Sequence, residues 1–211
     1  MNHPKNSFQY QNSIASKASS EIYTFLKNRK NVIDVINIER NRNFQCNGVD
    51  LLCFKKELNT IKTQSIEIKA DTHSNTNKYF LEVVGNDSTG VPGGIIYTIA
   101  DYIFYYFIGI KELHVIERIY LQQWIYNNGN NLNYIDVPTV DKNNNFLYNT
   151  TGALVSRELL KNTIPIWIYD LNLNILKYKP DVKLLASGLL NFNANVTYML
   201  HTQYIVHDYQ I

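Results

Sequence analysis

The pattern of apolar and polar positions predicts alternating helices and strands through the first half of the chain. Ser19 and Ser20 precede apolar residues at i, i+3 and i+4 spacing, which predicts a serine-capped helix of roughly three turns. Strands are predicted where β-branched residues gather, or where apolar and charged residues alternate. These strands span residues 32–39, 48–54, 64–71 and 79–84, with a turn region at 55–63.

The second half of the chain has a similar but less regular pattern. Residues 95–110 are apolar, but this run is shorter than the ~20 residues of a membrane span and contains Asp101, so it predicts a buried helical turn followed by a core strand at 102–108. Thr151 or Ser156 is the expected cap of a helix that runs through Leu160. The other expected elements are a strand at 113–116, a helix at 117–126, a strand at 164–169 and a helix at 182–190.

Two segments predict loops, and neither divides the chain. Residues 85–94 contain four glycines and a proline, and residues 127–149 are polar and rich in Asn. We find no internal repeat and no long linker. The chain is therefore expected to be a single domain over residues 1–211, with a core at about 19–126 and a C-terminal extension at about 127–211.

Composition and charge narrow the class of protein. The 211 residues are 45% hydrophobic and 18% charged, which is typical of a folded globular chain and excludes a disordered one. The formal net charge is only +2, so any binding to a polyanion requires a local basic patch. The abundance of Asn, Ile, Tyr and Lys is typical of A/T-rich coding. We therefore expect a bacterial protein, or a phage-encoded one made within a bacterial host.

The expected compartment is the cytoplasm. The polar, Asn-rich N-terminus has no apolar segment of the kind found in secretory signals. Cys46 and Cys53 are seven residues apart, which places them on opposite faces of a regular strand. A disulfide or a metal site formed by this pair is therefore not expected.

Three carboxylates interrupt the apolar strands of the first half, namely Asp50, Glu67 and Glu82. A carboxylate among core residues is costly unless it is paired or binds a metal. Alternation along the strand at 64–71 places Glu67 and Lys69 on the same face. Asp50 lies a hairpin length earlier in the chain, so it can lie beside Glu67 on a neighbouring strand. The sequence therefore predicts that two carboxylates and one ammonium group converge.

Such a trio suits metal-assisted hydrolysis of a phosphodiester. Mg²⁺ needs only one or two protein carboxylates, and completes its coordination with water and substrate phosphate. Asp50 and Glu67 are the expected ligands of Mg²⁺, or of Mn²⁺ in its place, and the backbone carbonyl of Ile68 is a further candidate. Lys69 is expected to orient or help to deprotonate the attacking water and to offset charge in the transition state.

The spacing of Asp50 and the segment Glu67-Ile68-Lys69 resembles the two-part signature of the PD-(D/E)XK nuclease superfamily. The resemblance covers residues from about 19 to 108. It implies an α/β fold with a restriction-endonuclease-like core, in which helices flank a mixed central β-sheet. In this chain, a C-terminal α/β extension follows the core. It also implies a Mg²⁺-dependent endonuclease that acts on DNA in restriction, repair or recombination.

The residues ahead of Asp50 add to the resemblance and also depart from it. Gln45, Gly48 and Val49 are similar to a Gln-x-x-Gly-(Val/Ile)-Asp sequence found in several members of the superfamily. Val49 stands where the signature has proline. The second half of the chain does not share the resemblance, which leaves the subfamily and the DNA specificity open.

Three further polar residues are candidates for supporting roles around this site. Gln45 could orient the water or a phosphate, or it could be a polar residue at a strand end. Glu82 could be another metal ligand, or a partner for Lys69 or for a buried hydroxyl. Glu21 could point into the site from the first helix, or it could be a first-turn acid that the helix dipole favours.

Basic residues flank the predicted site and are candidates for binding DNA phosphates, although they could equally be solvated surface residues. They are Arg40, Arg42, Lys55, Lys56 and Lys62. The expected partner is therefore nucleic acid, DNA in particular. No membrane association is expected, and a homodimer is left open.

Alternative functions remain compatible with the same residues. A nuclease-fold protein without activity could bind nucleic acid or serve as a phage structural component. A small-molecule enzyme with buried carboxylates is a third possibility, although the sequence has no recognisable cofactor motif. Glu67, Lys69 and Asp71 could also form a solvated face of an edge strand, with ion pairs that contribute little to stability.

Overall fold

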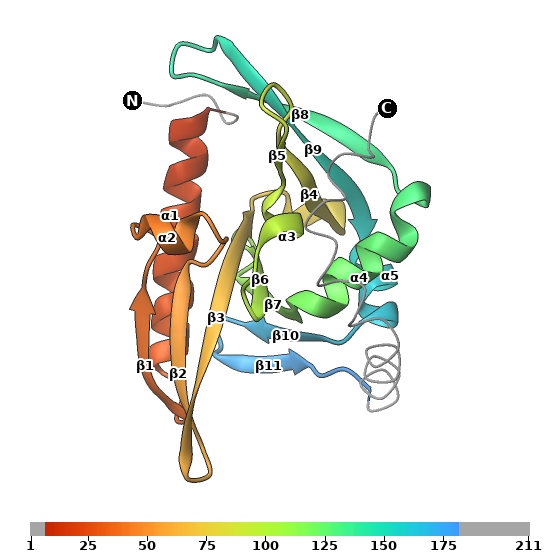
Figure 1. The fold of residues 1–211 in the computed structure, drawn as a ribbon. Coiled ribbons are helices and arrows are strands. Elements are labelled where there is room, and N and C mark those ends of the chain that lie inside the picture. Colours follow the sequence, from red (N-terminus) through yellow and green to blue (C-terminus); the bar gives the residue numbers. More distant parts are fainter. Residues whose placement is uncertain (1–6, 182–211) are drawn as a thin grey trace.

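The protein consists of two β-sheets with helices packed around them (Figure 1). The computed structural model describes residues 7–181. The large sheet has the order β1-β2-β3-β6-β7-β10-β11, and the smaller sheet has the order β5-β4-β9-β8. In the large sheet β3 and β6 are parallel, whereas its other neighbouring strands are antiparallel. The expected α/β class with a mixed central sheet is therefore confirmed.

The elements have the following bounds. The strands of the large sheet are β1 (Val32–Asn37), β2 (Leu51–Glu57), β3 (Thr60–Asp71), β6 (Tyr102–Phe107), β7 (Glu112–Glu117), β10 (Ile166–Asp170) and β11 (Ile175–Tyr178). Those of the smaller sheet are β4 (Lys78–Asn86), β5 (Val91–Pro92), β8 (Tyr134–Val140) and β9 (Phe146–Ser156). The helices are α1 (Phe8–Lys27), α2 (Arg42–Gln45), α3 (Gly94–Tyr97), α4 (Arg118–Asn128) and α5 (Arg157–Thr163), with short 3₁₀ turns at η1 (Ser74–Thr76) and η2 (Gly129–Asn131).

The first helix begins earlier than the sequence predicts. Ser7 caps α1 by accepting a hydrogen bond from the backbone N–H of Tyr10, so the predicted cap at Ser19 or Ser20 is wrong. Ser19 lies inside the helix, where it is buried and accepts a hydrogen bond from the Asn37 side chain. The apolar positions that follow the two serines mark the buried face of a long helix. They do not mark its start.

Three segments that were predicted to be irregular are more ordered. Residues 127–149 contain η2, β8 and the start of β9. The polar side chains of β8 form a solvated face of a strand, and they do not mark a loop. Residues 85–94 contain the end of β4, the short strand β5 and the start of α3. The turn predicted at 55–63 is limited to Leu58 and Asn59 at the tip of the β2–β3 hairpin.

The remaining elements agree with expectation where the structure describes them. The predicted strands are all present, and Ser156 caps α5 through the backbone N–H of Leu159. The helix predicted at 182–190 lies outside the described residues. Cys46 is exposed and Cys53 is buried, and both are free thiols. Between residues 7 and 181, no helix combines the length and hydropathy that a membrane-spanning segment requires.

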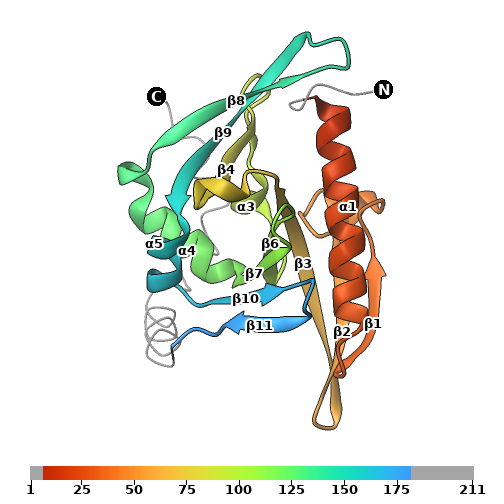
Figure 2. The same cartoon turned by 180° about the vertical axis from the view of Figure 1, so that it is seen from behind.

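Two hydrophobic clusters lie on opposite faces of the large sheet. One packs α1 against β2, β3 and β6, with Ile22, Leu51 and Ile66 at its centre. Figure 2, seen from behind, shows α1 crossing this face. The other cluster joins β6 to the smaller sheet, α4 and α5. Because strand side chains alternate, Ile66 and Ile68 face α1, whereas Glu67 and Lys69 point to the opposite face.

Residues from both halves of the chain share the second cluster. Tyr79 and Ile103, from the predicted core, pack there with Val155 and Ile166, from the predicted extension. The extension also completes both sheets, since β9 pairs with β4 and β10 pairs with β7. Among the described residues, the two halves are therefore parts of the same packed body.

Candidate functional site

Asp50 is fixed against β3 by its own backbone and by its side chain. It precedes β2, and its backbone N–H donates to the carbonyl of Ile66 at 2.8 Å. Its carboxylate oxygen Oδ2 accepts a hydrogen bond from the backbone N–H of Ile68 at 2.7 Å. The predicted hairpin therefore brings Asp50 beside the Glu67-Ile68-Lys69 segment.

Glu67 and Lys69 form an ion pair on the face of β3 that points away from α1. The distance from Lys69 Nζ to Glu67 Oε1 is 2.7 Å, and the Glu67 residue is only 5% exposed. A buried carboxylate requires such a partner, because burial removes the water that would otherwise solvate its charge. The three residues of the predicted trio are thus gathered at one place, and the solvated edge strand considered above does not describe Glu67.

The electrostatics of this cluster are strongly perturbed. Burial raises the pKa of Asp50 to about 7, and the negative charge of Glu67 adds to the effect. Burial opposes the charged form of Lys69, but the carboxylates of Glu67 and Glu82 outweigh it and raise the Lys69 pKa. Lys69 is therefore an ammonium group at neutral pH. An ammonium group has no lone pair to accept a proton, so in this form Lys69 is suited to the other two expected parts, which are to orient the water and to offset negative charge.

Glu82 belongs to this cluster through helix α3. Glu82 Oε1 accepts a hydrogen bond from the backbone N–H of Gly94 at 3.1 Å, which holds the first residue of α3 over Lys69. A Cβ atom on Gly94 would lie 2.1 Å from Lys69 Nζ and 3.2 Å from Glu67 Oε1. Figure 1 shows α3 between β3 and β4, in the position that these contacts require.

The glycine pair at the start of α3 is the feature that sequence reasoning missed. A Cβ atom on Gly93 would lie 2.3 Å from the backbone oxygen of Glu82, so only glycine fits there. Tyr97, at the other end of α3, is also close to the cluster: burial raises the pKa of its hydroxyl, and the charge of Glu67 raises it further. The adjacent glycines before an apolar run were the available signal.

Two predicted supporting residues lie elsewhere. Glu21 accepts hydrogen bonds from the hydroxyl of Tyr106 and from Lys111 Nζ, the latter at 2.6 and 2.7 Å, on the face of the large sheet that α1 covers. It cannot reach Glu67 on the opposite face, so the prediction for Glu21 is wrong. Gln45 is exposed at the end of α2, and in the described part of the chain no hydrogen bond joins its side chain to Asp50.

The basic residues occupy different environments. Arg40, Arg42, Lys56 and Lys62 are exposed, so they are accessible to a charged partner. Lys55 is partly buried on the α1 face of β2, and burial lowers its pKa. The contacts of the described residues place none of these side chains in the Asp50 cluster.

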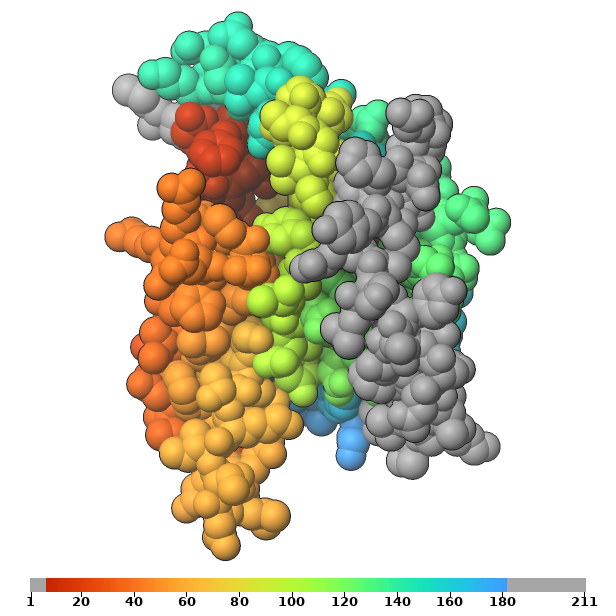
Figure 3. All heavy atoms as spheres, viewed as in Figure 1, coloured from red at the N-terminus to blue at the C-terminus, as the bar shows by residue number. Residues whose placement is uncertain are grey.

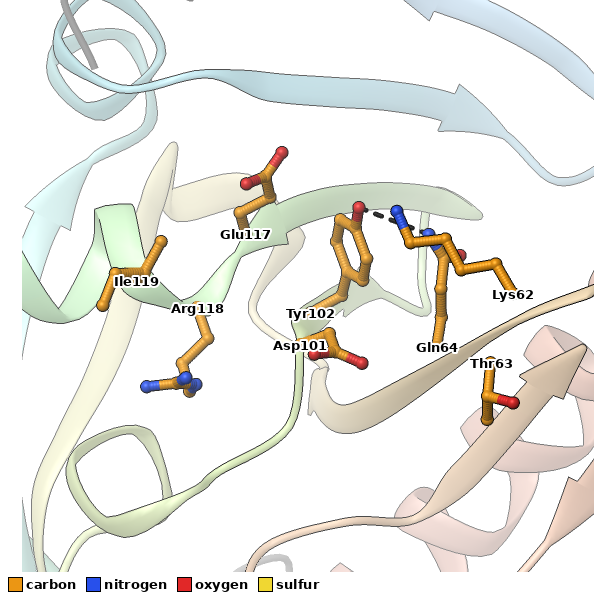
Figure 4. Close-up of a pocket in the computed structure, with 8 residues that line it drawn as sticks. All are labelled: Lys62, Thr63, Gln64, Asp101, Tyr102, Glu117, Arg118 and Ile119. Atoms are coloured by element: carbon orange, nitrogen blue, oxygen red, sulfur yellow. Dashed lines mark hydrogen bonds between the residues drawn. The ribbon is translucent and has the colours of Figure 1, made fainter. Parts of the chain in front are cut away.

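A pocket of about 270 Å³ lies on another part of the large sheet (Figure 4). Two of its charged groups are already engaged: Asp101 accepts hydrogen bonds from Ser65, and Arg118 donates to the carbonyl of Ala100 and to Gln122. None of the trio lines this pocket. These contacts tie the residues just before β6 to the middle of β3 and to the start of α4, and we assign the pocket no chemistry.

Within residues 7–181 no group of three or more His, Cys, Asp or Glu side chains is arranged to hold a metal ion. Any cation at the Asp50 cluster would therefore have few protein ligands. Comparison of the chain with models of protein families, with curated proteins and with solved structures finds no match.

Proposed function

We propose that this protein is a metal-dependent nuclease that hydrolyses phosphodiester bonds in DNA and is built on a restriction-endonuclease-like core. The observation that carries the proposal is the convergence of Asp50, Glu67 and Lys69 on paired strands. It is the spatial arrangement that the resemblance to PD-(D/E)XK nucleases implies. A chance occurrence of these three residue types in the sequence would not require their side chains to lie close together.

The strand order supports the same proposal. Helix α1 packs on the antiparallel strands β1, β2 and β3, and β6 then lies parallel to β3. This order supports the superfamily resemblance, which implies a helix, three strands and a further strand, and the short helix α3 directly precedes β6. In this chain β4 and β5 are inserted before α3 and belong to the smaller sheet.

The donor atoms fit a divalent cation. Burial raises the pKa of Asp50 and the negative charge of Glu67 raises it further, and a divalent cation would favour the charged carboxylate against both effects. The N–H of Ile68 donates to Asp50, and the N–H and C=O of a strand residue point to the same side, so the Ile68 carbonyl is directed to the β2 side of β3. Two carboxylates and one carbonyl suit Mg²⁺ or Mn²⁺, which add water and phosphate oxygens.

The metal, Glu67 and Lys69 would each have a different part in hydrolysis. When bound, the metal would supply a Lewis acid and lower the pKa of a bound water. Glu67 pairs with Lys69 through Oε1, and its carboxylate would also be a ligand of the cation. Lys69, held as an ammonium group, would offset negative charge on the phosphate as it develops in the transition state.

The test is cleavage of DNA by the purified chain. Supercoiled, linear and branched DNA are incubated with Mg²⁺, with Mn²⁺ or with EDTA. We expect cleavage with either metal, none with EDTA, and a loss of at least about 100-fold in Asp50→Asn, Glu67→Gln and Lys69→Ala.

The matched control is Glu158→Gln, which removes an exposed carboxylate from α5 and should cut at the wild-type rate. A folded wild-type protein that cuts none of the three DNA forms would refute the nuclease proposal. It would leave the inactive nucleic-acid-binding protein as the better description. Undiminished cleavage by Lys69→Ala would contradict the part assigned to Lys69.

A further inference from the structure

The tip of the β2–β3 hairpin carries an apolar side chain in an unfavourable place. Leu58 is 95% exposed, more than any other large hydrophobic residue among those described. Its φ angle is +52°, in the left-handed region that residues with a Cβ atom adopt only at a cost in energy. Two-residue hairpin turns usually place Gly, Asn or Asp at such positions. Neither solvation nor turn geometry accounts for a leucine here.

The hairpin around Leu58 is basic. Lys55, Lys56 and Lys62 stand against a single acid, Glu57, in the strand ends that flank the turn. Within the described residues, neither Lys56 nor Lys62 forms a salt bridge, and both are exposed. Since side chains alternate along a strand, Lys56 lies on the face that carries Glu67, whereas Lys62 lies on the α1 face. The apolar tip therefore has positive charge on both sides.

The hairpin is continuous with the candidate site. Asp50 immediately precedes β2, and Glu67 and Lys69 lie on β3. The strands next to the trio therefore also form the β2–β3 hairpin. Figures 1 and 3 show the hairpin extending beyond the body of the molecule. Leu58 is eight residues from Asp50, which at about 3.3 Å per residue places the tip roughly 25 Å from the site.

We infer that the hairpin tip is a DNA wedge, in which Leu58 inserts between base pairs while Lys56 and Lys62 contact the phosphates on either side. Apolar wedges enter duplexes most easily where stacking is already weak, so DNA with a branch or a mismatch is the preferred form. The inference rests on the proposed function, because it takes DNA as the substrate. At about 3.4 Å per base pair, the wedge enters roughly seven base pairs from the cut.

The test measures DNA binding without cleavage. Branched and linear fluorescent duplexes are titrated with wild-type protein and with Leu58→Asn in EDTA. Asn tolerates the left-handed backbone, so the variant should melt at or above the wild-type temperature. We expect about 10-fold weaker binding to branched DNA and a smaller loss on linear DNA. The matched control is Leu173→Asn, because Leu173 is an exposed leucine in the β10–β11 turn and its loss should change neither affinity.

Two further measurements test the phosphate contacts of the lysines and the position at which Leu58 enters the DNA. Lys56→Ala and Lys62→Ala should weaken binding to both DNA forms and lower the dependence on salt by about one unit each. A 2-aminopurine base placed roughly seven base pairs from the cut should brighten on binding wild type and remain dim with Leu58→Asn.

The outcomes separate the wedge from the nuclease. Cleavage by wild type together with unchanged DNA binding by Leu58→Asn would overturn the wedge and leave the proposed function in place. Binding that depends on Leu58 in a protein that never cuts DNA would support the wedge and overturn the nuclease. If Leu58→Asn instead abolishes self-association of the free protein and leaves DNA binding unchanged, the tip contacts a second copy, and the wedge is wrong.

Discussion

At the scale of single residues, the two glycines at the start of α3 differ in what a larger side chain would disturb. Gly93 approaches the backbone of Glu82, which cannot move without disturbing β4, whereas Gly94 approaches the flexible end of Lys69. Gly93 is thus required by the fold, whereas Gly94 is required by the arrangement of the site.

Substitution of each glycine by alanine should reveal this difference. Gly93→Ala is expected to destabilise the protein by roughly 3 kcal/mol, because its Cβ atom has no room. Gly94→Ala should cost less than about 1 kcal/mol, because the Lys69 side chain can shift. It should nevertheless lower DNA cleavage at least about 10-fold by displacing the ammonium group. Urea unfolding and a cleavage assay measure the two effects, and equal losses of stability would contradict the contrast.

The trio was predictable because its members lie close together in sequence. Alternation along one strand places Glu67 with Lys69, and a single hairpin brings Asp50 to them. Glu82 was foreseen as a possible partner for Lys69, but its hydrogen bond from Gly94 was not predictable, because it depends on how β4 in the smaller sheet meets α3. Glu21 was misplaced because its face of α1 could not be read until the true start of the helix was known.

At the scale of elements, α1 depends on a cap that sequence reasoning did not find. Ser7 is buried and accepts from the N–H of Tyr10, whereas Ser20 is exposed within the helix. We expect Ser7→Ala to lower the free energy of unfolding by about 1 kcal/mol, and Ser20→Ala to change it by less than about 0.5 kcal/mol. Urea titration followed by circular dichroism gives both values. A loss in Ser20→Ala as large as that in Ser7→Ala would contradict this assignment.

Strands were easier to predict than their places in the sheets. Period-two alternation located β3 correctly, but the same pattern occurs in any sheet with one buried face. Which strands pair is decided by contacts distant in sequence, such as Tyr79 opposite Val155. The polar strand β8 has little apolar alternation, and for that reason it was taken for a loop.

At the scale of the whole molecule, a buried polar network ties several elements together around His114. Its Nδ1 accepts a hydrogen bond from the Tyr79 hydroxyl, and its Nε2 donates to Glu112 at 2.9 Å. Glu112 also accepts from Arg157 at 3.1 Å and from Lys177 at 2.7 Å. The network thus joins β4, β7, α5 and β11.

This network should make the protein sensitive to acid. The hydrogen bond from His114 lowers the pKa of Glu112 to about 2, and burial lowers the pKa of His114. The unfolded chain therefore binds more protons than the folded one, so stability falls as the pH drops below about 6.5, the ordinary pKa of His. Between about pH 4.5 and pH 2, loss of the Glu112 charge should cost on the order of 2 kcal/mol.

The corresponding measurement is urea unfolding of wild type and Glu112→Gln at several pH values. The variant should be less stable at pH 7, because His114, Arg157 and Lys177 lose a charged acceptor. Its stability should also fall less steeply than that of wild type below pH 4.5. Identical pH dependence in the two proteins would show that Glu112 does not carry the effect.

The pairing of β4 with β9 has a consequence for synthesis of the chain. Tyr79 and Leu81 pack in a cluster whose other members include Val155 and Ile166, and these residues leave the ribosome only after α4 and β8 have been made. At a synthesis rate of roughly 5–20 residues per second, β9 is made several seconds after β4. During that interval the apolar side chains of β4 are exposed on the nascent chain, where they can associate with other chains until β9 is made.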